Sequence, residues 1–196
     1  MGKGSVKQPT ICHSTVPSVI ADEDLSAMLS RLPSWRREKA LLYRRPLDRY
    51  LCAEAYFLLE SVLGKSLCRA EWGYSPSSKP FIPGHPEIHF SLSHCERCVA
   101  CAVAPVPVGI DVETLQYDPS LAQMVCSAEE MALIDASASP EEAFTSLWTR
   151  KESYLKMTGE GLRDDLKSVP GSDSRCITDT RIAAGEGYAL SWSMRI

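Results

Sequence analysis

Residues 88–113 read IHFSLSHCERCVACAVAPVPVGIDVE, and this stretch decides the fold. It contains three short runs that are rich in β-branched and small apolar residues. These runs predict strands at Ile88–His94, Cys98–Ala104 and Val108–Glu113. Turn-forming residues or prolines lie between them, as expected between neighbouring strands. The centre of the chain is therefore predicted to be a β-sheet region.

Helix signals flank this region on both sides. From Asp48 to Leu63 the apolar residues recur at helical spacing, and Gly64 supplies a C-terminal stop. Beyond the strands, Ser127 and Glu130 have the spacing of a capping box, which predicts the start of a short helix.

A longer helix is predicted from Pro140 to about Met157, with Ser139 as its N-cap and two acidic residues in its first turn. Residues 175–196 alternate weakly and predict one or two strands around a glycine-containing turn. Together these elements predict an α+β protein.

Composition limits the classes of function. The chain has 196 residues, of which 44% are apolar, so it can bury a substantial core. Its 21 Lys+Arg against 25 Asp+Glu give a net charge of -4, which does not favour nucleic-acid binding, so any phosphate site must be local. Residues 1–7 lack the apolar core of a signal peptide, and no stretch approaches the ~18 apolar residues of a membrane span. We therefore expect a cytoplasmic protein that does not bind membranes.

Eight cysteines without an export signal are expected to be reduced thiols. Cys95, Cys98 and Cys101 are spaced like part of an iron–sulfur motif, but Pro105 stands where the next ligand would fall. On a strand, residues three apart point to opposite faces, so Cys98 and Cys101 could not easily share a metal. We interpret them as small apolar strand residues, and a metal-binding or redox protein is the alternative.

Two carboxylates, Asp111 and Glu113, are two residues apart on the third predicted strand, so both point to one face about 6–7 Å apart. The valines and isoleucine between and around them would pack into the core on the other face. Like charges that converge on one point favour a divalent cation between them, and carboxylates with few other protein ligands suit Mg²⁺. A solvated sheet face is the alternative.

Further polar residues lie at the ends of predicted elements. Glu152 and Lys156 are one turn apart on the long helix, where an i,i+4 pair is usually a surface ion pair. Ser93 and His94 end a predicted strand, where a loop could present both to a ligand phosphate. A nucleophile and its base must face each other, whereas adjacent strand residues point apart, so we do not interpret these two as part of a catalytic triad.

Four motifs in register resemble one family. Lys79-Pro80, Phe90–His94, Gly109–Glu113 and Trp148–Ser153 occur in the order and at the separations typical of the 4'-phosphopantetheinyl transferases of the surfactin-synthetase-activating type. The resemblance extends roughly from Arg36 to Leu162. It implies a pseudodimer of two similar α+β halves with coenzyme A in the cleft between them. We place the division at residues 104–105, so that residues 1–104 contribute the nucleotide contacts and residues 105–196 the metal site and the catalytic helix.

The resemblance implies roles for the acidic residues. Asp111, Glu113 and Glu152 would hold Mg²⁺ against the pyrophosphate of coenzyme A. Glu152 would also take the proton from a serine of the carrier protein, directly or through a water. Lys156 would stabilise or protonate the departing 3',5'-ADP.

The resemblance also implies which residues bind coenzyme A. They are Lys39, Arg49, Lys79, Ser93 and His94. Lys39 belongs to a basic run from residue 36 to residue 39 that resembles the family's stretch at the 3'-phosphate.

Sequence leaves open which of Arg36, Arg37 and Lys39 makes that phosphate contact, and a solvated helix face is the alternative for the whole run. The acceptor would be an apo acyl or peptidyl carrier protein, an acidic helical bundle. We expect the basic residues between Arg31 and Arg49 to serve partly in docking it. A monomer is expected, and the alternative function is a non-catalytic relative that binds coenzyme A or a carrier protein.

Overall fold

The computed structural model describes residues 8–161, 166–169 and 173–196. Residues 1–7, where the sequence predicts no signal peptide, and Leu162, where the family resemblance ends, lie outside the described residues. In chain order the elements are β1 (Thr10–Thr15), α1 (Asp22–Ser30), α2 (Ser34–Leu41), α3 (Pro46–Leu63), α4 (Lys65–Cys68), β2 (Gly73–Tyr74), β3 (Pro80–Phe81), β4 (His89–His94), β5 (Cys98–Ala104), β6 (Val108–Thr114), α5 (Pro119–Val125), α6 (Ala128–Asp135), α7 (Pro140–Thr158), β7 (Cys176–Ala183), the 3₁₀ turn η1 (Ala184–Glu186) and β8 (Tyr188–Arg195).

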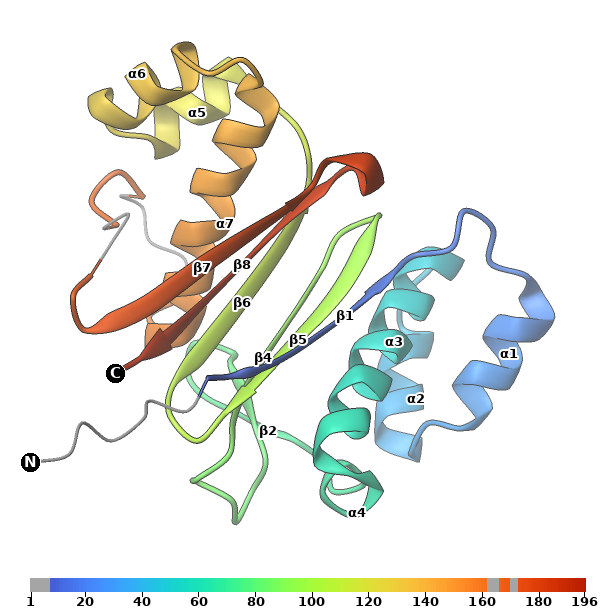
Figure 1. Cartoon of the computed structure of the whole chain (residues 1–196). Coiled ribbons are helices and arrows are strands. Elements are labelled where there is room, and N and C mark those ends of the chain that lie inside the picture. Colours follow the sequence, from blue (N-terminus) through green and yellow to red (C-terminus); the bar gives the residue numbers. More distant parts are fainter. Residues whose placement is uncertain (1–7, 162–165, 170–172) are drawn as a thin grey trace, which may run out of the picture.

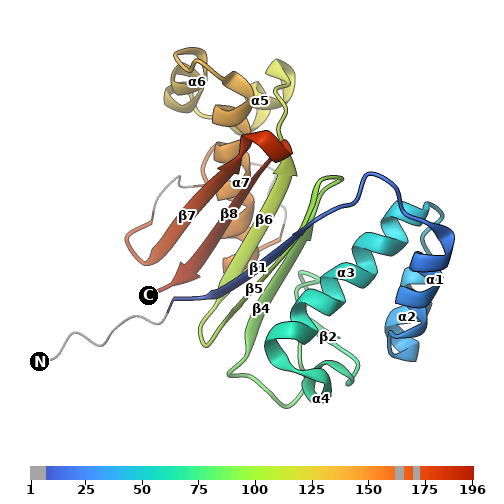
Figure 2. The same cartoon turned by 45° about the vertical axis from the view of Figure 1, so that its right-hand side comes forward.

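Two antiparallel sheets of three strands each form the centre of the described structure. The first sheet has the strand order β1-β5-β4, and the second has the order β6-β8-β7. Strands β2 and β3 form a separate two-stranded ribbon. Helix α3 packs on the first sheet and α7 on the second, so the sheets lie between these two helices (Figures 1 and 2). The predicted α+β class is confirmed.

The two sheets share one topology. In each, the first strand lies at an edge, helices follow, and a hairpin then places its second strand in the centre. The first unit runs from β1 through α3 to β4 and β5, and the second from β6 through α7 to β7 and β8. This repeat is the arrangement that the expected pseudodimer requires. The expected division at residues 104–105 falls in the connection between β5 and β6.

Alternate residues of β5 face two different cores. Cys98 packs against β6 and β8, whereas Cys101 faces the core built around α3. This confirms the prediction that the two thiols point to opposite faces of a strand. All eight cysteines are free, and burial raises the pKa of Cys98 to about 12. A thiol with this pKa remains protonated at neutral pH and behaves as a small apolar side chain.

Strand β4 is joined to β6 by side-chain hydroxyls. The Oγ of Ser91 accepts a hydrogen bond from the Ile110 N–H at 3.1 Å, and the Oγ of Ser93 accepts one from the Val112 N–H at 3.3 Å. Both serines are buried, so these bonds are shielded from water. They fix the edge of the first sheet against the edge of the second, next to Asp111.

Helix α7 lies unusually close to β6. Gly109 has no side chain to separate them, and a Cβ at this position would overlap the main chain of α7 at Ser153. Buried hydroxyls also connect α7 to β8, because Thr149 Oγ1 lies 2.8 Å from Ser191 Oγ and Ser153 Oγ lies 2.9 Å from Ser193 Oγ. These contacts hold α7 at a fixed distance from the strand that carries the acidic pair.

The predicted helices are present, with boundaries shifted by a few residues. Helix α3 begins at Pro46 and ends before Gly64, whose φ of 82° only glycine adopts freely. The capping box of α6 is confirmed, with both Ser127 and Glu130 making their bonds. Ser139 stands at the N-cap of α7 as predicted, but its side chain makes no capping hydrogen bond. Among the described helices, none is both long enough and apolar enough to span a bilayer.

Candidate active site

The acidic residues of β6 and α7 meet in one cavity at the junction of the two sheets. The alternation of β6 places Asp111 and Glu113 on the face that α7 covers, opposite the apolar residues Ile110 and Val112. The cavity has a volume of about 430 Å³. Its lining residues are Arg36, Lys39, Tyr43, Cys52, Ala55, Leu92, Ser93, His94, Asp111, Glu113, Trp148, Glu152 and Lys156.

Asp111, Ser93 and Lys156 form a closed set of hydrogen bonds. Asp111 Oδ1 accepts from Lys156 Nζ at 2.6 Å and from Ser93 Oγ at 2.9 Å, and Ser93 Oγ accepts from Lys156 Nζ at 3.0 Å. The Asp111 side chain is only 3% exposed, whereas that of Lys156 is 33% exposed and opens to the cavity. Charge-assisted bonds of this kind are short and strong, so they hold the Lys156 ammonium at the cavity wall.

The two glutamates carry raised pKa values. Burial and the charge of Asp111 raise the pKa of Glu113 to about 7, and the same two causes raise the pKa of Glu152. These two causes indicate that both glutamates lie near Asp111 in a poorly solvated place. Clusters of perturbed acids in a cleft are typical of functional sites.

His94 also lines the cavity. It ends β4 next to Ser93, and burial followed by the nearby charge of Lys156 lowers the pKa of its imidazole. The ring is therefore neutral at pH 7 and can donate one hydrogen bond to an anion.

The donor set suits a divalent cation. Asp111 Oδ2 and Glu152 Oε1 are buried oxygens without a hydrogen-bond partner, which is costly unless a cation or a ligand takes up the contact. As the described side chains stand, no group of three or more His, Cys, Asp or Glu is arranged to hold a metal ion. The ammonium of Lys156 instead occupies one oxygen of Asp111. The chemistry of the acids fits Mg²⁺, and binding it would require their side chains to turn toward one point.

Two residues of the basic run reach the cavity. Lys39 lines it, and its Nζ donates to the hydroxyl of Tyr74 at 2.9 Å. Arg36 also lines it and is 5% exposed, with one nitrogen 2.8 Å from the Cys52 carbonyl oxygen and its guanidinium over the Trp72 ring. Its buried Nε has no hydrogen-bond partner. Of the three basic residues among which the sequence left the choice open, Arg36 and Lys39 line the cavity and Arg37 does not.

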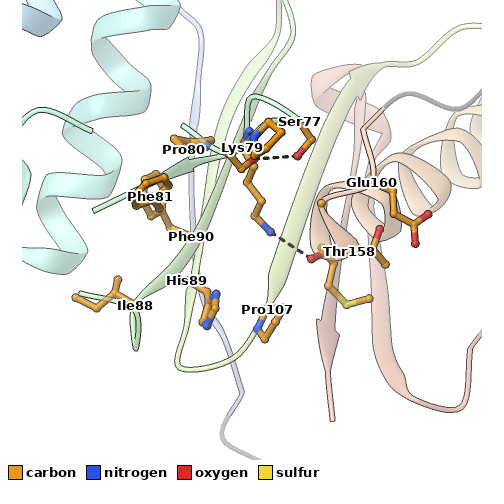
Figure 3. A pocket seen from close by; sticks show the side chains of 14 residues that line it. Ser77, Lys79, Pro80, Phe81, Ile88, His89, Phe90, Pro107, Thr158 and Glu160 are labelled. Atoms are coloured by element: carbon orange, nitrogen blue, oxygen red, sulfur yellow. Dashed lines mark hydrogen bonds between the residues drawn. The ribbon is translucent and has the colours of Figure 1, made fainter. Parts of the chain in front are cut away.

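Two expected coenzyme A ligands do not line this cavity. Arg49 donates from Nε to the Tyr43 carbonyl oxygen at 2.9 Å and borders a separate hollow with Arg37, between α1, α2 and α3. Lys79 extends across the cleft to the end of α7, where its ammonium contacts main-chain carbonyls (Figure 3). The structure therefore brings Ser93, His94 and Lys39 into the cavity with Asp111, Glu113 and Glu152. Lys79 lines a neighbouring hollow together with Glu152 and Lys156, whereas Arg49 borders neither of these two hollows. The ligand roles of all five stay predictions.

Some lining residues were not predicted. Trp148 stands four residues before Glu152 on α7, so helical spacing alone would place it on the same face. Tyr43 has no such signal, because it follows α2 in a loop whose position depends on the tertiary fold.

Lys151 explains why Glu152 faces the cavity. Adjacent residues on a helix point about 100° apart, and the Lys151 side chain is held on the other side of α7. Its Nζ donates to Glu130 Oε2 at 2.6 Å, to the Val125 carbonyl at 2.8 Å and to the Leu166 carbonyl at 3.1 Å. The side chain is 2% exposed, so this buried ion pair fixes the rotation of α7 about its axis.

Comparison with known proteins identifies the family. The sequence model of the 4'-phosphopantetheinyl transferase superfamily matches residues 107–195. A 4'-phosphopantetheinyl transferase of Bacillus subtilis is 29% identical over 162 residues, which is 76% of this chain and 72% of the relative. The 4'-phosphopantetheinyl transferase Sfp of Bacillus subtilis strain 168 is 30% identical over 156 residues, covering 76% of this chain and 70% of the relative. A yeast relative, the L-aminoadipate-semialdehyde dehydrogenase-phosphopantetheinyl transferase of Saccharomyces cerevisiae, is 27% identical over 168 residues, covering 77% of this chain and 62% of the relative.

Proposed function

Because the chain belongs to the 4'-phosphopantetheinyl transferase superfamily, we propose that it transfers the 4'-phosphopantetheine group of coenzyme A to a serine of an apo carrier protein. The products are the holo carrier protein and 3',5'-ADP. One observation carries the proposal. Asp111, Glu113 and Glu152 line one cavity between the two halves, and two of their oxygens are buried without hydrogen-bond partners.

Asp111, Glu113 and Glu152 would hold Mg²⁺ in this proposal. When bound, the ion supplies positive charge that offsets the charge developing on the pyrophosphate oxygens. The raised pKa of Glu113, about 7, supports a cation site, since the unliganded carboxyl keeps its proton and a nearby cation would remove it.

Glu152 is the proposed base. The proton of the carrier serine passes to its carboxylate, the serine oxygen bonds to the phosphorus next to pantetheine, and the bond from that phosphorus to the bridging oxygen breaks. In the metal-free protein, burial and the charge of Asp111 raise the pKa of Glu152. Lys156, one turn later, faces the same cavity and would stabilise or protonate the departing 3',5'-ADP.

Coenzyme A is proposed to bind along the cavity wall opposite the helix. Ser93 and His94 at the end of β4 would contact its phosphates, and Lys39 with Arg36 would meet the 3'-phosphate. Arg49 remains a proposed nucleotide contact that would need its side chain to leave the Tyr43 carbonyl. In this arrangement residues 1–104 supply the nucleotide contacts, and residues 105–196 supply the acids.

The proposed partner is an apo acyl or peptidyl carrier protein. Because one chain supplies both halves of the cleft, we propose that the enzyme acts as a monomer. Its eight free thiols support a cytoplasmic location, since cysteines remain reduced there.

Kinetics of charge-neutral variants test these roles. Glu152→Gln and Asp111→Asn should each lower kcat for holo-carrier formation, with Glu152→Gln costing about 10²- to 10⁴-fold because a general base contributes that much. Glu71→Gln is the matched control, because Glu71 is exposed and lies outside the cavity. Wild-type rates for both cavity variants would show that this cavity is not the active site.

A further inference from the structure

Lys79 donates to three main-chain carbonyls of the other half of the molecule. Its Nζ lies 2.5 Å from the Lys156 oxygen, 2.9 Å from the Val108 oxygen and 3.3 Å from the Met157 oxygen. An ammonium has three protons, and three acceptors engage all of them. No proton of Lys79 remains for a phosphate oxygen while these bonds are made.

The three acceptors lie at the end of α7 and the start of β6, the two elements that carry the acidic residues of the site. The last carbonyls of a helix have no partner within the helix, and they carry the negative end of its dipole. Gly159, the C-cap of α7, donates to the Leu155 oxygen, and Lys79 takes the next two carbonyls. The third acceptor, Val108, begins β6, the strand of the acidic pair. One cation thus ties the end of α7 to the start of β6.

The loop that carries Lys79 is itself closed by hydrogen bonds. The Ser75 N–H donates to the Lys79 carbonyl at 2.9 Å, and the Lys79 N–H donates to Ser75 Oγ at 3.1 Å. Ser78 adopts a φ of 63°, a region that residues other than glycine rarely occupy. Backbone conformations of this kind persist where the surroundings impose them, often at functional sites. The loop therefore presents Lys79 in a defined direction, across the cleft (Figure 3).

We propose that Lys79 is a positioning residue of the active site: its ammonium fixes the last turn of α7 against β6, so that Lys156 reaches Asp111 and Ser93. The inference rests on the proposed transferase function and assigns Lys79 a role other than that of a coenzyme A ligand. Lys156 is bonded at both its main chain and its side chain. Its carbonyl oxygen accepts from Lys79, and its own Nζ donates to Asp111 at 2.6 Å. Movement of that backbone displaces the ammonium of Lys156 directly.

The two roles for Lys79 make different kinetic predictions. If Lys79 positions Lys156, Lys79→Met should lower kcat by roughly 10- to 100-fold, since displacement by about 1 Å can cost 10²-fold. The dissociation constant for coenzyme A should then change by less than about threefold, because no phosphate bond is lost. Lys79→Arg, which keeps the charge, should recover part of the kcat. Lys65→Met, at an exposed lysine of α4, is the matched control.

The experiment measures coenzyme A binding by calorimetry and holo-carrier formation by mass spectrometry for each variant. In the Lys156→Ala background, Lys79→Met should add little further loss of kcat, because residues that act through one another are not additive. An unchanged kcat, a coenzyme A dissociation constant raised about tenfold or more, or an additive loss in the Lys156→Ala background would each overturn the proposal.

Hydrogen exchange provides a readout that does not need activity. In Lys79→Met, amides in residues 155–161 should exchange faster than in wild type, whereas Lys65→Met should leave them unchanged. Unchanged exchange in Lys79→Met would also overturn the positioning role. A wild-type protein that transfers nothing would contradict the proposed function, and the exchange comparison would still decide the contact of Lys79 with α7.

Discussion

Replacing Gly109 by alanine tests the packing that brings Glu152 over β6. An alanine Cβ would overlap the carbonyl oxygen of Ser153 and the main-chain nitrogen of Met157, and would lie 2.9 Å from the carbonyl carbon of Lys156. These are backbone atoms of α7, so no side-chain rotation relieves the overlap. The helix itself must move away from the strand.

The size of the effect follows from these distances. Carbon atoms in contact are normally about 3.5–4.0 Å apart, so contact with Lys156 alone requires α7 to retreat by roughly 1 Å. Overpacking of this kind costs about 1–3 kcal/mol of unfolding free energy, and occasionally more. Displacement of a catalytic group by about 1 Å can cost 10²-fold in rate. We therefore expect Gly109→Ala to lose about 3 kcal/mol of stability and at least about 10²-fold in kcat.

Urea unfolding and holo-carrier formation measure these two quantities. Gly185→Ala is the matched control, because nothing lies within 4 Å of a Cβ there and its φ is not positive. This control should stay within about 0.5 kcal/mol of wild type. A Gly109→Ala protein with the urea midpoint of the control and a wild-type rate would show that α7 does not lie against β6 as described. The placement of Glu152 over the acidic pair of β6 would then be wrong as well.

Three further perturbations have defined outcomes. The folded, metal-free protein holds the proton of Glu113 up to its pKa of about 7, whereas the unfolded chain loses it near 4.5, so unfolding free energy should fall as pH rises through this window in EDTA. Urea midpoints between pH 5 and pH 8 should show this fall in wild type more than in Glu113→Gln, and parallel curves would contradict it. Lys151→Met should cost about 3 kcal/mol because it leaves the Glu130 carboxylate, which is only 15% exposed, without its cation. The double variant with Glu130→Gln should recover part of that loss in a double-mutant cycle, so strictly additive losses would argue against the ion pair. If basic residues between Arg31 and Arg49 dock an acidic carrier, its KM should rise with salt, and a salt-independent KM would count against docking there.

Local sequence patterns predicted much of the fold because their signals are short-range. The alternation of Val108–Glu113 correctly gave a strand with acids on one face and apolar residues on the other. Helices α3, α6 and α7 were identified from apolar spacing together with glycine, capping-box or proline signals at their ends. For each of these, the pattern and the tertiary environment agree.

Other elements depend on distant partners and carry little local signal. Strand β1 is an edge strand whose residues are mostly half-buried, and it pairs with β5 about ninety residues later in the chain, as in Thr10 with Val103. Helix α2 is strongly basic, and Arg36 is buried in it only because Trp72 and the Cys52 carbonyl lie opposite. No periodicity within α2 reveals those partners.

In the candidate site, too, some residues could be placed from the local sequence and others could not. Strand geometry alone placed Asp111 and Glu113 together, whereas the addition of Glu152 and Lys156 came from the family resemblance. The position of Lys79 could not be predicted from either source, because its three acceptors lie 29, 77 and 78 residues further along the chain. Its contacts exist only once both halves have folded against each other.

The most direct test of the central claim is the intact mass of an apo acyl carrier protein after incubation with this protein, coenzyme A and Mg²⁺. The account predicts a gain of the phosphopantetheine mass on the carrier, which EDTA and Glu152→Gln should both abolish. A panel of fatty-acid, polyketide and peptidyl carriers that stays unmodified while the protein binds coenzyme A would contradict it and would identify a non-catalytic relative.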